Sequence, residues 1–166
     1  MERLWSPWRL AYVTGTDKPD TDCIFCSALE RAEAEPLVLY IGETCFIILN
    51  LYPYNNGHLM VVPKRHIATL AAATPQELAD LMLLTQRAEL ALTEAYSPHG
   101  MNVGINLGRP AGAGVLDHLH VHVVPRWNGD TNFMSVVGNV RVLPEELPQA
   151  SAKLRPIFAR LAARHE

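Results

Sequence analysis

Three histidines alternate with aliphatic residues in one short segment. His118, His120 and His122 are separated by Leu119 and Val121, so an extended strand would place all three imidazoles on one face. Alternate side chains on a strand start about 6.6 Å apart, so a neighbouring pair could share a metal ion, but the outer two start roughly 13 Å apart. At least one histidine should therefore stay unligated. The alternatives are a solvated strand with incidental histidines or a simple metal site.

The middle histidine has the surroundings that a nucleophile needs. A neutral imidazole attacks phosphorus near neutral pH when a hydrogen bond fixes its other ring nitrogen. The segment before the strand, AGAGVLD (111–117), contains Gly112 and Gly114, whose backbone amides can approach phosphate oxygens closely. Such a loop alone would indicate no more than a flexible turn. Joined to the histidine strand, it predicts attack by His120 on a phosphoryl group.

The cysteines form a second candidate constellation. Cys23 and Cys26 make a CxxC pair and Cys45 stands alone, which is too few for a disulfide framework. The pair could be a redox pair, two buried thiols or half of a zinc site. Cys45 is expected to be a small apolar filler on its strand.

The elements that must position these residues are mostly strands. Five segments are rich in β-branched and aromatic residues or alternate in polarity, and turn formers separate them. They cover residues 37–42, 45–50, 58–63, 101–107 and 118–125. Short connections between neighbours favour hairpins, so we expect an antiparallel α+β domain.

Helical patterns account for most of the remaining sequence. The clearest helix is expected from Thr74 to about Tyr96, because Thr-Pro-Gln-Glu supplies a capping hydroxyl, a first-turn proline and a glutamate for a capping box. Shorter helices are expected over 27–33 and 149–164, the latter kinked or delayed by Pro156. On the long helix one stripe should face the core and another should face water: Leu78, Leu81, Met82, Ala88, Ala91, Leu92 and Ala95, against Glu77, Asp80, Arg87 and Glu94.

Length and charge narrow the function classes. A chain of 166 residues is expected to form one domain. The net charge is −3 and there is no long Lys/Arg run, so we expect no binding of polymeric nucleic acid. No apolar window is long enough for a membrane span and no signal peptide is evident, which predicts a cytoplasmic protein. Four basic residues could still attract a polyphosphate locally: Lys64, Arg65, Arg109 and Arg126.

Several motifs resemble those of a known family. HLHVHVV (118–124) resembles the signature of the histidine triad family of nucleotidyl hydrolases and transferases, and NLYPYNNGHLMVVPKRH (50–66) is similar to the family's other conserved block. SPWR (6–9), NVGINLG (102–108) and VVPRWNGDTNF (123–133) are similar to the branch that contains diadenosine tetraphosphate phosphorylases. The resemblance implies a five-stranded antiparallel sheet with a long helix and a C-terminal helix packed against it.

The resemblance also implies an activity. His120 would attack the α-phosphorus of an adenine dinucleoside polyphosphate, such as diadenosine tetraphosphate, and form a nucleotidyl-histidine intermediate. His122 and His58 would contact the phosphate and the leaving group. Asn50 would bind ribose, Asn106 would contact phosphate, and the base pocket would be lined by Ile24, Phe25, Ile48 and Leu51. The stretch after the triad, with Trp127, Asn128, Asp130, Asn132 and Phe133, would shape the site for the leaving nucleotide.

Zinc-bearing relatives suggest a role for the cysteines. His66 and His118 would complete a Cys2His2 site with Cys23 and Cys26, tying the N-terminal segment 1–36 to the sheet within a single domain, 1–166. A closed four-ligand site leaves no position for water, so this Zn²⁺ would be structural. The resemblance further implies a homodimer.

The loop before the triad departs from the pattern of the phosphorylase branch. This affects whether phosphate or water accepts the nucleotidyl group from His120. The phosphorylase branch usually carries a serine in the loop before the triad, where this chain has Ala111-Gly112-Ala113-Gly114-Val115. Both phosphorolysis and hydrolysis therefore stay open. Three alternatives compete with this function: a nucleoside phosphoramidate hydrolase, a zinc-stabilised nucleotide-binding module without catalysis, and a zinc hydrolase that uses metal-bound water, which would need an open coordination position.

Overall fold

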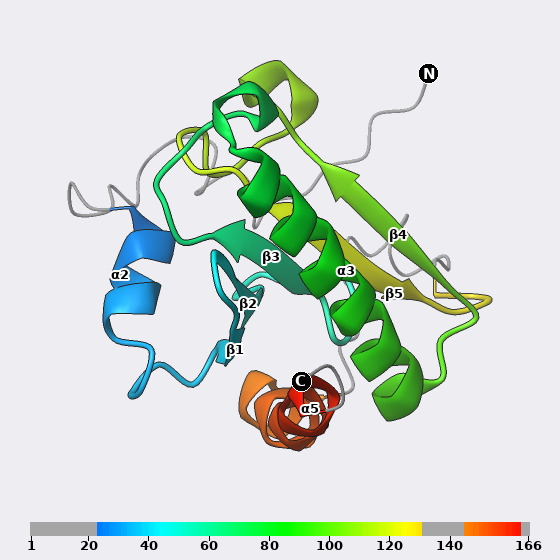
Figure 1. Cartoon of the computed structure of the whole chain (residues 1–166). Helices are drawn as coiled ribbons and strands as arrows, with labels where there is room; N and C mark the ends of the chain where they lie inside the picture. The colour runs from blue at the N-terminus through cyan, green and yellow to red at the C-terminus, as the bar shows by residue number, and fades with distance from the viewer. Residues whose placement is uncertain (1–22, 131–144, 164–166) are drawn as a thin grey trace, which may run out of the picture.

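The computed structural model describes residues 23–130 and 145–163. Its strands form one antiparallel sheet in the spatial order β1-β2-β3-β5-β4 (Figure 1). These are β1 (Val38–Ile41), β2 (Cys45–Leu49), β3 (Leu59–Pro63), β4 (Gly100–Ile105) and β5 (Val121–Arg126). The predicted α+β fold with five antiparallel strands is confirmed. The predictions for SPWR, Asn132 and Phe133 concern residues outside the described ranges.

Helices cover the two faces of the sheet unequally. The long α3 (Pro75–Tyr96) and the C-terminal α5 (Leu147–Ala162) pack on one face and enclose the main core with alternate residues of the strands. The short α2 (Ile24–Glu30) packs on the other face over a smaller cluster that includes Phe25, Ile48 and Met60. Two 3-10 turns, η1 (Leu70–Ala72) and η2 (Arg109–Ala111), lie in the connections. Among the described residues, the helices therefore cover the second face only in part.

The start of α3 follows the predicted capping chemistry. The Thr74 hydroxyl accepts a hydrogen bond from the backbone of Glu77, and the Glu77 carboxylate accepts one from the backbone of Thr74. Pro75 occupies the first helical position, where a missing N–H costs nothing. None of the helices in the described ranges is long and apolar enough to span a membrane.

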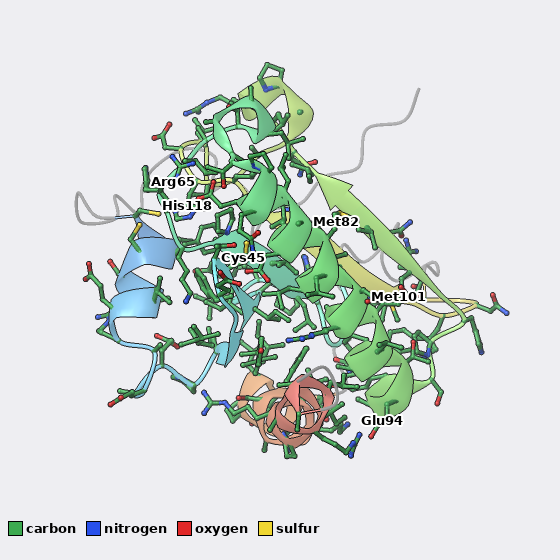
Figure 2. All side chains as sticks on the ribbon, viewed as in Figure 1. Cys45, Arg65, Met82, Glu94, Met101 and His118 are labelled. Atoms are coloured by element: carbon green, nitrogen blue, oxygen red, sulfur yellow. The ribbon has the colours of Figure 1, made fainter. Side chains whose placement is uncertain are left out.

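The predicted water-facing stripe of α3 is wrong at three positions. Glu77, Asp80 and Arg87 are buried, because each has a partner on a neighbouring segment. Glu77 pairs with Arg65, Asp80 accepts hydrogen bonds from the backbone of residues 44 and 45, and Arg87 bonds the Tyr40 hydroxyl. Conversely, Met82 was expected in the core and is exposed (Figure 2). Helical periodicity does not reveal such polar partners.

Several boundaries differ from the predictions, among them α2, which spans Ile24–Glu30 and not residues 27–33, and β4, which spans Gly100–Ile105 and not residues 101–107. The C-terminal helix continues through Pro156 from Leu147 instead of starting at residue 149. β5 starts at Val121, three residues later than predicted, because its pairing with β3 extends only from Val121 to Val123. Just before it, the Leu119 N–H donates to the carbonyl of Ile67, so the approach to β5 is held by a different segment.

Candidate active site

The three histidines lie together on the partly covered face of the sheet. His118 and His120 are 1% and 4% exposed, and His122 is half-buried on β5. The ring centroids of His120 and His122 are 4.8 Å apart. His118 lies close to the beginning of α2 (Figure 2).

The backbone fixes which nitrogen of His120 is available. Nδ1 of His120 lies 2.8 Å from the carbonyl oxygen of His118. A carbonyl oxygen can only accept, so Nδ1 must carry the proton, and Nε2 of the neutral ring keeps its lone pair. Burial lowers the pKa of His120 below its ordinary value of 6.5, which favours this neutral form. His120 therefore has the protonation state of a nucleophile.

A second chain of hydrogen bonds fixes His122. The Tyr54 backbone N–H donates to Nδ1 of the fully buried His58 at 3.0 Å, so that nitrogen has no proton. His58 must then carry its proton on Nε2 and donate it to Nδ1 of His122 at 2.9 Å. As a result His122 accepts at Nδ1 and presents an N–H at Nε2. The site combines a lone pair on His120 with a hydrogen-bond donor on His122.

The predicted nucleotide-binding residues fall into two groups. Phe25 and Ile48 are buried in the cluster beneath α2, and the Phe25 ring lies 5.1 Å from the ring of His120. Ile24 and Leu51 are exposed at 49% and 55%. Ile24 and Leu51 are thus available to a ligand, whereas Phe25 and Ile48 are part of the buried cluster beneath α2.

The two predicted asparagines are tied to neighbouring segments. Asn50 accepts from the Tyr52 backbone N–H at 2.9 Å, and its side-chain nitrogen lies 3.3 Å from Nδ1 of His58. Asn106 donates to the carbonyl of Gly112 at 3.4 Å. Gly112 has a φ of 88°, a conformation that favours glycine, and Gly114 is exposed in the same loop. The end of β4 is thereby linked to the predicted phosphate-binding loop.

The predicted metal ligands converge at the other end of the histidine face. One ligand atom from each of Cys23, Cys26, His66 and His118 lies within 4.8 Å of all the others. Nε2 of His118 must carry a proton, because it lies 2.8 Å from the carbonyl oxygen of Pro63. Nδ1 therefore has the lone pair, and it faces the Cys23 sulfur at 3.2 Å. This tautomer and donor set fit a tetrahedral Zn²⁺ site.

The environment of the cysteine cluster is better suited to a bound cation than to free thiols. Burial and the neighbouring Cys23 thiol raise the pKa of Cys26 above its ordinary value. Without a metal, the Cys26 thiol would stay protonated near neutral pH, whereas a bound cation would stabilise its thiolate. The cluster is thus better suited to holding a metal than to acting as a reactive redox pair.

Two of the predicted basic residues already have acidic partners. Arg65 forms two hydrogen bonds with Glu77 at the start of α3, at 2.8 and 2.7 Å. Arg126 forms two with Asp130, at 2.6 and 2.8 Å. Their charges are therefore largely neutralised within the protein, which weakens the prediction that they attract a polyphosphate.

Sequence reasoning missed two features of the site. Tyr54 fixes the tautomer of His58 through its backbone N–H, so no side-chain pattern could have revealed it. A hollow of about 270 Å³ also adjoins His122, with Asn55 and Asn102 among its lining residues. These residues lie far apart in the sequence, and only the pairing of β4 with β5 brings Asn102 beside the triad strand.

The chain is similar in sequence and fold to known proteins. The family model described as the HIT domain matches residues 31–129. The chain is 41% identical to the AP-4-A phosphorylase of Mycobacterium tuberculosis, over 96% of this chain and 86% of that protein. It is 31% identical to the bis(5'-adenosyl)-triphosphatase of Dictyostelium discoideum, over 73% and 85%. The crystal structure of a Zn-bound histidine triad family protein from Mycobacterium smegmatis superposes with a TM-score of 0.69 at 31% identity, covering 86% and 97%.

Proposed function

Because this chain belongs to the HIT domain family, we propose that it is an enzyme that cleaves adenine dinucleoside polyphosphates through a covalent intermediate on His120. The names of its relatives support the substrate class. The observation that carries the mechanism is the hydrogen bond from Nδ1 of His120 to the carbonyl of His118, which leaves Nε2 as a lone pair.

In the first step Nε2 of His120 attacks the α-phosphorus, and the bond from that phosphorus to the bridging oxygen breaks. The remainder leaves as a nucleoside polyphosphate anion. The Nε2–H of His122 donates a hydrogen bond to the departing oxygen, where negative charge develops. The new phosphorus–nitrogen bond makes the imidazole cationic, and the His118 carbonyl stabilises that charge by accepting from Nδ1–H.

In the second step water or phosphate attacks the same phosphorus. The phosphorus–nitrogen bond breaks, its electron pair returns to Nε2, and the proton of the attacking group is released. Water yields a nucleoside monophosphate, whereas phosphate yields a nucleoside diphosphate. The backbone amide of Gly114 and the side-chain amide of Asn106 are proposed to hold the phosphate oxygens, whereas the Gly112 N–H already donates to the carbonyl of Arg109 at 3.0 Å. Asn50, Ile24 and Leu51 are proposed to contact the transferred nucleoside, with Phe25 and Ile48 behind them.

We further propose that Cys23, Cys26, His66 and His118 hold a structural Zn²⁺. The four converging ligand atoms and the tautomer of His118 support this, as does the Zn-bound relative. With all four positions taken by protein, the ion would stabilise the fold and supply no reactive water. The predictions of a single domain over residues 1–166, a homodimer and a cytoplasmic location stay predictions.

The decisive experiment is product identification with diadenosine tetraphosphate, with and without inorganic phosphate. ATP with AMP indicates hydrolysis, and ATP with ADP indicates phosphorolysis. Rapid acid-free quenching should trap a nucleotide on the protein through an acid-labile bond. If neither products nor an adduct form with this substrate or with adenosine phosphoramidate, the protein is a nucleotide-binding module instead. Loss of activity on zinc removal from protein that stays folded would favour a zinc hydrolase.

A further inference from the structure

Beyond His122 the histidine face opens into the hollow of about 270 Å³ over β4 and β5. Gly104 lies directly opposite His122 in the strand register, and Asn102 lies opposite Val124. These residues are on the face of the sheet away from α3, as are the catalytic histidines. The volume is close to the lower end for small-molecule sites, roughly 300 Å³.

We propose that this hollow binds the nucleoside of the leaving nucleotide, the half of the substrate that is not transferred to His120. The inference rests on the proposed function and extends it to the second end of the substrate. Gly104 is then a specificity-determining residue, since its missing side chain leaves the space that the second nucleoside fills.

The position of the hollow supports this assignment. A dinucleoside polyphosphate carries a nucleoside at each end, so both ends need room when the α-phosphorus faces His120. On one side of His120 lies Phe25, in the buried cluster behind the residues proposed to contact the transferred nucleoside. On the other side lie His122 and then the hollow. Binding the leaving end there would help to hold the reacting atoms in position.

The lining of the hollow suits an uncharged, hydrogen-bonding group. At its far end Arg126 is paired with Asp130 through two hydrogen bonds, so the two charges offset each other. Asn102 and Asn55 join the same network, accepting from Arg126 and donating to Asp130 respectively. Amides at this end can exchange hydrogen bonds with a base or a ribose. A wall made for phosphates would instead carry excess positive charge.

The aromatic ring of Tyr54 adds an apolar contact at the near end. Tyr54 lines the hollow, and its ring centroid is 5.7 Å from that of His122. Bases stack on such rings with little dependence on their identity. The Tyr54 ring therefore suits a planar base, and the amides at the far end of the hollow suit a polar ribose.

Gly104 offers a direct test because its environment is open. A Cβ built on Gly104 meets no atom of residues 23–130 or 145–163 within 4 Å, so within this part of the chain a larger residue is accommodated but projects into the hollow. Gly100 is a matched control, since it lies on the same face of β4, also has open space around a Cβ, and does not line the hollow. Valine suits a strand at either position.

The experiment compares Gly104→Val and Gly100→Val on two substrates, diadenosine tetraphosphate and adenosine phosphoramidate, whose leaving group is only ammonia. Gly104→Val should lower kcat/KM for the dinucleotide by about tenfold or more, a loss within the range that one or two methyl groups produce in a pocket. It should leave the phosphoramidate reaction and the affinity for AMP unchanged. Gly100→Val should change neither reaction.

The inference is overturned if Gly104→Val affects both substrates equally or neither, or if Gly100→Val has the same selective effect. Thermal unfolding identifies a folding defect, in which case Gly104→Ala replaces the valine variant and is judged by the same criterion. A wild type that cleaves neither substrate and forms no adduct refutes the proposed function itself, and this inference with it.

Discussion

His118 and His120 are separated by one residue and both are buried on the same face, yet their environments prepare them for different chemistry. His118 donates from Nε2 to the carbonyl of Pro63, whereas His120 donates from Nδ1 to the carbonyl of His118. The lone pair is therefore on Nδ1 in the first ring and on Nε2 in the second. A backbone carbonyl selects the available nitrogen in each case.

The surroundings of the His118 and His120 rings also differ. The lone pair of His118 faces two cysteine sulfurs and shares its cluster with His66. His120 contacts Phe25 on one side and His122 on the other. Burial lowers the pKa of both histidines, so the neutral form is common to them. The direction of the lone pair and its neighbours therefore distinguish the proposed metal ligand from the proposed nucleophile.

The largest expected effect comes from replacing the nucleophile. His120→Asn keeps a side chain that can donate to the His118 carbonyl but removes Nε2. Turnover should fall by roughly 10⁴-fold or more, as it does when the nucleophile of a covalent mechanism is removed, while circular dichroism shows a folded protein. His99→Asn, at an exposed histidine, is the control. Near-normal activity of His120→Asn would show that His120 is not the nucleophile.

In the cluster that contains His118, Cys26→Ser should lower both the metal content and the thermal stability of the protein. Loss of a structural metal is among the changes that cost more than about 4 kcal/mol, which lowers Tm by roughly 8–16 °C in a domain of this size. Cys45→Ser makes the same chemical change in the core, outside the cluster. Elemental analysis should find zinc in Cys45→Ser and the wild type, but not in Cys26→Ser. Full retention of zinc by Cys26→Ser would contradict the assignment.

Replacement of His58 should have an effect smaller than that of the His120 and Cys26 variants. His58→Phe fills a similar volume but removes the donor that orients His122. Turnover should fall by roughly 10- to 100-fold, as for other groups that orient a reacting side chain. Because His122 is proposed to donate to the leaving oxygen, the variant should lose much less activity on an adenylate ester with a nitrophenolate leaving group. An equal loss with both leaving groups would point to a structural role alone.

The smallest expected effect concerns Glu77, which pairs with Arg65, the residue next to His66 of the proposed metal site. Hydrogen bonds from Arg65 and from the backbone of Thr74 lower the pKa of Glu77 from 4.5 to about 2. Its ionised form is favoured by folding, so its contribution is fully present above pH 4.5 and disappears as the pH falls towards 2.

Glu77→Gln should therefore lower the free energy of unfolding by roughly 1 kcal/mol near neutral pH, the scale of a partly exposed ion pair. Urea denaturation at several pH values measures the difference from the wild type, which should shrink on acidification below pH 4.5. Adduct formation at His120 should be unaffected. A difference that is independent of pH would exclude the ion pair as its cause.

Several features could be predicted from local sequence. The alternation of His118, His120 and His122 determined that they share a face, because side-chain direction on a strand depends only on neighbouring residues. The Thr74 capping box determined the start of α3 for the same reason. The CxxC pair alone left a redox pair, two buried thiols and half of a zinc site open, and the other two ligands came from the family resemblance.

Only the tertiary structure decided the tautomers and the space around them. The Pro63 carbonyl is 55 residues from His118, and His58 is 64 residues from His122. Both hydrogen-bonded pairs form only because the strands pair, and the hollow at Gly104 depends on the same strand pairing. The partners that bury Glu77, Asp80 and Arg87 likewise come from other segments. Residue periodicity is a property of one segment, whereas a hydrogen bond between segments depends on how the chain folds back on itself.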